Sequence, residues 1–203
     1  PLYSSAASDV YKRQNQDAPF GLKPIGKVGQ NRDNQGLSEY DIAASATAIY
    51  FNDPVKMKAD GTIEVAGAGG AILGSLGGIF FTDATTGKPT FANHLNASNT
   101  ATDIVGFVSD DPYQRFEIQT NNTGASANTD IFNVADIEYT AGSSPDFVSA
   151  VELNDSTLAN GSSATLQILG LSRDPSNNTV GAANVNWIVR INEHELDMNV
   201  NGV

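Results

Sequence analysis

The chain has 203 residues, no cysteine and a formal net charge of −12. The lack of cysteine excludes disulfides and thiolate metal sites, and the length is sufficient for a packed core without such cross-links. The excess of acidic residues argues against nucleic-acid binding, because so few cations cannot build a basic face.

The first segment, SSAASDVYKRQ at residues 4–14, resembles the in-frame translation of a transposase adapter used for shotgun sequencing libraries. We therefore expect residues 1–14 to be adapter-derived and non-native, and the natural sequence to begin near Asn15. Without them, nine Lys and Arg face twenty-two Asp and Glu, which gives a net charge of −13. The alternative is a native basic N-terminus in which Lys12 and Arg13 bind acidic partners.

Residues 15–35 contain prolines and glycines but no alternating apolar run. We predict an extended N-terminal arm that lies on a surface. Lys23, Lys27 and Arg32 place three of the nine remaining cations here, so the arm is suited to an acidic neighbouring subunit. An ordinary irregular N-terminus is the alternative.

Alternation of apolar and polar residues dominates the remainder of the chain, which is typical of half-buried strands. Trp187 and Val189, for example, face away from Ile188 and Arg190. We predict strands over residues 42–51, 62–66, 72–81, 104–108, 116–119, 147–153, 166–169 and 187–192. Residues 130–139 fit either a short helix or a strand. The prediction is an all-β fold: a single compact β-barrel or sandwich over residues 36–203 with little helix.

The longest uncharged stretch, residues 65–82, is long enough to cross a bilayer but is rich in glycine. Two strands joined by a glycine turn explain it better, and we predict no membrane association.

Residues that could carry chemistry are few. His94 and His194 are the available imidazoles, and neither has an apparent triad partner. Asp110 and Asp111 precede a proline and are interpreted as turn formers before metal ligands. We therefore predict no catalytic, cofactor-binding or metal-binding residue, and no enzymatic activity.

The order of motifs is more informative than any single motif. The chain contains NQDAPFGLKP at residues 15–24, NDPV at 52–55, DDP at 110–112, FEIQ at 116–119, LQILGL at 166–171, NVNW at 184–187 and RINEH at 190–194. This series resembles a family of small structural proteins of tailed bacteriophages, notably marine phages, over residues 15–194. Residues 195–203 depart from the pattern, because members usually stop or vary there.

The resemblance implies a virion protein, made in the cytoplasm of the host bacterium, that decorates or cements the phage head. Such proteins resemble β-barrels with an extended arm and often sit on the capsid as trimers. The implied partners are the major capsid protein, other virion subunits and further copies of the chain. We expect the arm to make the capsid contact through Pro19, Phe20, Leu22, Lys23 and Pro24.

Other functions remain open at this stage. The chain could belong to the tail, the neck or a fibre of the virion. A virion-borne glycan hydrolase would need two convergent carboxylates, for which Asp110 and Asp111 are the testable pair. A secreted adhesin would need a signal peptide before Asn15.

Overall fold

Strands account for nearly all the regular structure. The computed structural model describes residues 15–29, 36–121, 126–161 and 163–197. The predicted arm residues 30–35 and the adapter-like residues 1–14 lie outside these ranges. The described residues form β1 (Lys23–Lys27), β2 (Ser38–Ile42), β3 (Pro54–Met57), β4 (Ile63–Val65), β5 (Gly74–Thr82), β6 (Pro89–Ala92), β7 (Ile104–Ser109), β8 (Gln114–Gln119), β9 (Val134–Ala135), β10 (Ile137–Glu138), β11 (Glu152–Leu153), β12 (Leu166–Leu171) and β13 (Asn186–Ile191). Two 3₁₀ turns, η1 (Asn128–Asp130) and η2 (Asp155–Thr157), complete the list. The predicted all-β fold with little helix is confirmed.

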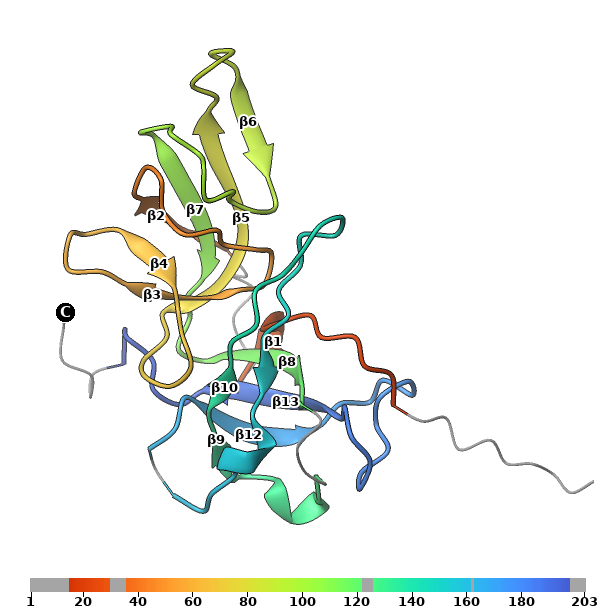
Figure 1. Cartoon of the computed structure of the whole chain (residues 1–203). Helices are drawn as coiled ribbons and strands as arrows, with labels where there is room; N and C mark the ends of the chain where they lie inside the picture. The colour runs from red at the N-terminus through yellow and green to blue at the C-terminus, as the bar shows by residue number, and fades with distance from the viewer. Residues whose placement is uncertain (1–14, 30–35, 122–125, 162, 198–203) are drawn as a thin grey trace, which may run out of the picture.

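One sheet curls into a small barrel, the upper part of Figure 1. Its order is β3-β4-β2-β7-β5-β6, and β3 also pairs with β5, so five strands close on themselves and β6 extends β5 outside the ring. The pairing is antiparallel except between β2 and β4, which meet at Ile42 and Ile63. The buried residues of this core are all aliphatic.

The barrel interior is so narrow that β7 needs a glycine where it faces inward. A Cβ on Gly106 would lie 3.0 Å from Ile42 Cδ1 and 3.3 Å from both Ile63 Cδ1 and Leu76 Cδ1. Interiors packed to this density have no room for larger side chains. Of the aromatic residues on these strands, Tyr40 and Phe81 pack partly buried against this core, and none is fully buried in it.

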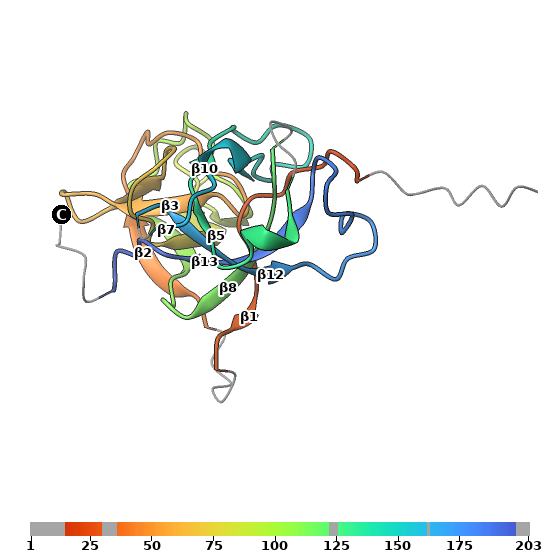
Figure 2. The same cartoon turned by 90° about the horizontal axis from the view of Figure 1, so that it is seen from below.

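The second sheet, with order β1-β8-β13-β12-β9, lies below the barrel in Figure 1 and is seen from below in Figure 2. Its inner face carries Phe116, Ile118, Trp187 and Val189, all 1% exposed or less. The β10–β11 hairpin supplies Ile137 and Leu153 to the same core. The predicted alternation in β8, β12 and β13 is thus confirmed.

The two halves are joined by more than the chain between β7 and β8. The Leu22 amide donates to the Asn52 carbonyl oxygen (3.0 Å), and the Ser75 hydroxyl donates to the Leu22 carbonyl oxygen (2.6 Å). Ile72, just before β5 of the barrel, has its side chain in the core of the other sheet and bridges to His194. Hydrogen bonds and apolar contacts therefore both cross the junction.

Several strand boundaries differ from the predictions. The run 42–51 is no strand, because β2 ends at Ile42 and the chain then turns, and residues 147–153 contribute only β11. β1, β3 and β6 were missed because each contains or begins with proline, which weakens the strand signal. The undecided residues 130–139 contain β9 and β10.

Turns with glycine at positive φ join several strands. Gly61 has φ +84° in the turn between β3 and β4, a conformation that favours glycine. The stretch 65–82 consists of the end of β4, a turn with Gly69 and Gly70 at positive φ, and β5. Within the described residues there is no helix whose length and apolarity would let it cross a membrane.

Candidate interaction surface

The described part of the N-terminal arm, residues 15–29, packs on its own domain. The Asn15 side-chain amide donates to the carbonyl oxygens of Thr179 (3.0 Å) and Ala183 (2.7 Å). The Ala18 amide donates to Gln119 Oε1 at 3.0 Å. Further along, β1 pairs with β8 as the edge strand of its sheet.

The five arm residues predicted to contact a capsid have different environments. Leu22 is fully buried in the core of the sheet half, so its role is structural and its side chain is not available to a partner. Pro19 and Phe20 are half-buried. Lys23 and Pro24 are exposed, but the Lys23 ammonium lies 3.3 Å from a Glu117 carboxylate oxygen and 5.6 Å from the Phe20 ring centroid. A capsid contact through the exposed arm residues stays a prediction.

The outer face of the barrel carries a continuous apolar surface, which we call the aromatic face. It consists of Leu37, Phe80, Phe91, Val105 and Phe107. Phe80 is the register partner of both Phe91 on β6 and Val105 on β7, and Phe107 pairs with Gly78 beside it. Leu37 lies over Gly77, with its Cδ1 2.9 Å from the position a Cβ on Gly77 would take.

The rings of this face contact one another but remain open to solvent. The Phe80 and Phe91 centroids are 4.8 Å apart, and Phe91 and Phe107 are 6.5 Å apart with planes inclined by 17°. Phe91 is 74% exposed and Leu37 is 48% exposed. A shallow hollow of about 370 Å³ lies between the rings, over Gly77 and Gly78. Aromatic residues exposed to this degree are typical of surfaces that bind other proteins.

The borders of the aromatic face differ in chemistry. On the β2 side, Glu39 is opposite Phe107 and Asp41 is opposite Val105, and both acidic residues are exposed. On the other side, β6 pairs with β5 alone among the described strands, so its outer backbone groups are open for a further strand. A partner can therefore approach from the β6 side without meeting the acidic border.

Asp53 is a buried carboxyl at the junction of the two halves. Its Oδ2 accepts the Tyr50 amide at 2.7 Å, whereas Oδ1 meets no hydrogen-bond donor among the described residues. Burial raises the pKa of Asp53 to about 6, against the lowering effects of Ser149 and of the Tyr50 amide. Because Asp53 is 0% exposed, no solvent-borne substrate reaches it in this structure.

Neither histidine lies in an arrangement typical of catalysis. The His94 ring stacks on Phe147 with centroids 3.9 Å apart, and burial lowers the pKa of His94. His194 is 1% exposed, and its Nδ1 accepts the Leu196 amide at 3.0 Å. Burial also lowers the pKa of His194, although nearby aspartates raise it.

The two carboxylates of the DDP motif are engaged in structural contacts. Asp110 accepts the Tyr40 hydroxyl at 2.7 Å, and this carboxylate together with burial raises the pKa of Tyr40. Asp111 accepts the Tyr113 amide at 2.8 Å and pairs with the Lys27 ammonium at 2.6 Å. The interpretation as turn formers agrees with this geometry, since the Gln114 amide also donates to the Asp111 carbonyl oxygen.

No protein-family model, curated protein or solved structure matches this chain.

The aromatic face was not predicted, although the sequence contains a signal for it. Residues 79–81, Ile-Phe-Phe, break the alternation within β5, so apolar side chains must point to both sides of that strand.

Proposed function

We propose that the chain is a non-enzymatic structural protein of a phage virion, a head decoration or cement protein, that binds its neighbours through the aromatic face. The observation that best supports this binding surface is the outward position of Phe80, Phe91 and Phe107. Their strands already fill the barrel with their inward residues. The virion assignment itself rests on the resemblance of the dispersed sequence motifs.

The energetics of this face suit assembly. Burial of one exposed phenylalanine side chain contributes roughly 1.5–3 kcal/mol, so the rings can supply a stable contact once a partner covers them. Repetition of the contact on a capsid lattice multiplies a modest single affinity. The chain's formal net charge of −12 keeps decorated particles mutually repulsive.

Co-sedimentation with capsids of a phage that encodes this chain tests the proposal. Phe91→Ala should weaken binding at least tenfold, by about 1.4 kcal/mol or more. Phe132→Ala is the matched control, because Phe132 is 72% exposed but lies in the loop before β9, away from the aromatic face. Capsid binding by Phe91→Ala equal to that of the unsubstituted chain would show that this face is not the docking surface.

The arm can be tested separately on its exposed residues. Pro24→Ala leaves the core and the Lys23–Glu117 ion pair untouched, because the Pro24 side chain is exposed. If the arm adds to the capsid contact, this variant should bind more weakly than the unsubstituted chain and fold equally well. Immunogold labelling of virions distinguishes the head from the alternative positions on the tail, neck or fibres.

A further inference from the structure

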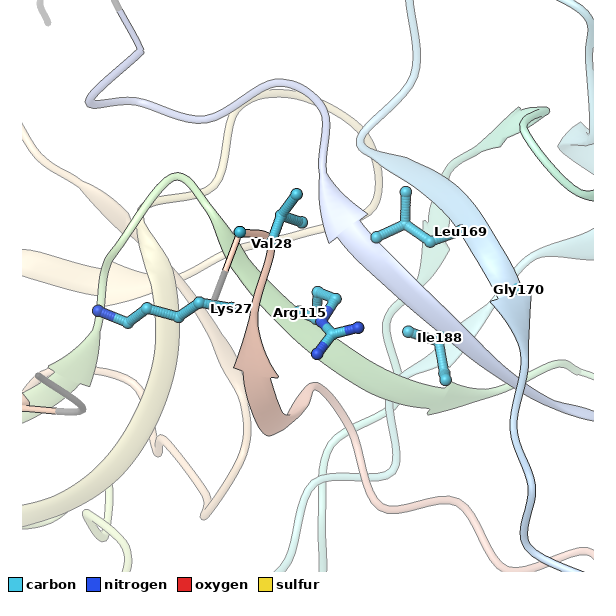
Figure 3. Close-up of a pocket in the computed structure, with 7 residues that line it drawn as sticks. Lys27, Val28, Arg115, Leu169, Gly170 and Ile188 are labelled. Carbon is cyan, nitrogen blue, oxygen red and sulfur yellow. The ribbon is translucent and has the colours of Figure 1, made fainter. Parts of the chain in front are cut away.

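A second surface lies on the outer face of the five-stranded sheet, on the other half of the molecule. A groove of about 370 Å³ lies there. Figure 3 shows Val28, Leu169 and Ile188 at its walls and the Arg115 guanidinium between them. The walls come from the end of β1, from β12 and from β13, so the groove is built on paired strands. It combines apolar contact area with a cation.

The groove lies beside a pair of like charges, of which Arg115 is one of its lining residues. Arg115 on β8 and Arg190 on β13 are direct register partners, and both point outward because Phe116 and Val189 beside them point into the core. Arg190 Nε donates to Gln167 Oε1 at 2.8 Å, whereas Arg115 Nε is buried and has no hydrogen-bond partner among the described residues. Neither guanidinium forms an ion pair with any of the described residues. Like charges directly opposite one another destabilise a sheet.

Nearby lysines on the same sheet differ from these arginines, because each has a carboxylate partner. Lys23 pairs with Glu117 and Lys27 pairs with Asp111. Arg115 and Arg190 are therefore not compensated by any carboxylate of the described residues, in a chain with 23 acidic and 11 basic residues. A buried guanidinium nitrogen without an acceptor calls for an anionic group from another molecule.

The β10–β11 hairpin of the same half carries a pair of negative like charges, although Glu138 accepts a hydrogen bond from the Asn121 side-chain amide. Glu138 on β10 and Glu152 on β11 are also direct register partners, and they point outward because Ile137 and Leu153 point into the core. No lysine or arginine of the described residues pairs with either glutamate. Burial and the nearby carboxylates of Asp17, Glu138 and Asp155 raise the pKa of Glu152 to about 7.

We propose that two copies of the chain associate head to tail, with the Glu138–Glu152 pair of one copy seated against the Arg115–Arg190 pair beside the groove of the next. Each like-charge pair is then neutralised by its opposite, and the apolar walls exclude water around the contact. Arginine suits this role because its guanidinium binds carboxylates in bidentate fashion. A contact between two different surfaces closes into a ring or grows into a filament, depending on the rotation between copies. The contact is independent of the aromatic face and of the proposed capsid binding.

Sedimentation equilibrium of the full chain over a range of protein concentrations tests this contact. The unsubstituted chain should associate, and raising the salt concentration from 0.05 M to 0.5 M should weaken the association. Arg115→Glu with Arg190→Glu, and separately Glu138→Lys with Glu152→Lys, should each weaken association at least tenfold. An equimolar mixture of the two double variants should restore it, because every contact between one variant and the other again joins opposite charges.

Controls separate this contact from general charge effects and from misfolding. Lys56→Glu with Glu64→Lys exchanges an exposed ion pair on β3 and β4 and should leave association unchanged. Arg115→Gln with Arg190→Gln keeps polar side chains and gives the same loss if the glutamate variant fails to fold. The proposal is overturned if the unsubstituted chain stays monomeric, or if the mixture associates no better than either variant. If the Phe91→Ala variant associates as strongly as the unsubstituted chain, self-association does not depend on the aromatic face.

Discussion

The two halves of the molecule distribute their aromatic residues in opposite ways. The sheet half places Trp187 and Phe116 in its core and arginines on its outer face. The hydrophobic core of the barrel half consists of fully buried aliphatic residues, with Tyr40 and Phe81 packed partly buried against it, and Phe80, Phe91 and Phe107 lie outside. The crowding around Gly106 leaves no space for a ring at that point of the interior.

The contrast shows which aromatic residues hold the fold together and which are free for another role. A ring in the sheet core removes apolar area from water and fills space that would otherwise be a cavity. A ring on the aromatic face removes little apolar area from water and fills little interior space, because Phe91, for example, is 74% exposed. Phe91 is therefore better explained by a partner than by stability.

The largest effect is expected at Trp187, the single tryptophan of the chain. Trp187→Ala should lower the free energy of unfolding by about 3–5 kcal/mol, because it opens a large cavity in the sheet core. Urea unfolding followed by circular dichroism measures the loss. A change below about 1 kcal/mol would mean that the core is not packed around this ring.

Leu76→Ala in the barrel tests whether the halves are one cooperative unit. The loss should be about 2–5 kcal/mol, and the fluorescence of Trp187 in the other half should report it fully, because Leu22 and Ile72 connect the two cores. A fluorescence transition that is unmoved by Leu76→Ala would show that the halves unfold separately.

Leu22→Ala should also cost about 2–5 kcal/mol, because this arm residue is fully buried in the sheet core. Pro24→Ala, two residues away and exposed, is the control and should change stability little. Thermal unfolding of both variants distinguishes an arm that is part of the fold from an arm that only reaches for a partner. Equal midpoints for Leu22→Ala and the unsubstituted chain would favour the second description.

Asp53 at the junction makes stability depend on pH. Its pKa is about 6 in the folded protein and 3.8 ordinarily, so folding favours the protonated form. The stabilisation is complete below about pH 4 and is lost as the pH rises through 6, a change of roughly 3 kcal/mol. Asp53→Asn should remove this part of the pH dependence and be more stable than the unsubstituted chain at pH 7. Urea unfolding at pH 4, 5, 6 and 7 measures the free energy of unfolding of both proteins. If the two free energies change with pH in parallel, Asp53 does not cause the pH dependence.

The sequence predicted the fold class and the central strands because alternation is strongest where one face is fully buried. The runs around Phe116, Leu166 and Trp187 were placed on strands with the correct inward residues. The division into a closed barrel and an open sheet was not predictable. It depends on the β3–β5 pairing and on the single contact between β2 and β4, which are long-range pairings without a local signal.

The candidate surfaces were harder to predict than the fold. The arm was expected to carry the contact, but Leu22 lies in the core and the exposed Lys23 pairs with Glu117. The aromatic face needs β6, which begins at Pro89 and was not predicted as a strand. The facing pair of Arg115 and Arg190 follows from the register of β8 with β13, which separates the two residues widely in sequence.

Two phenylalanines in different environments provide the most direct test of the contrast between the halves. The variant at the exposed one should show the smallest loss of stability. Phe116→Ala should lower the free energy of unfolding by about 3–5 kcal/mol, because Phe116 is 1% exposed. Phe91→Ala should lower it by less than about 1 kcal/mol, the contribution of its contact with Phe80. Urea unfolding measures both variants under the same conditions. A loss at Phe91 as large as that at Phe116 would mean that the aromatic face supports the barrel itself, and the argument for a partner at this face would then fail.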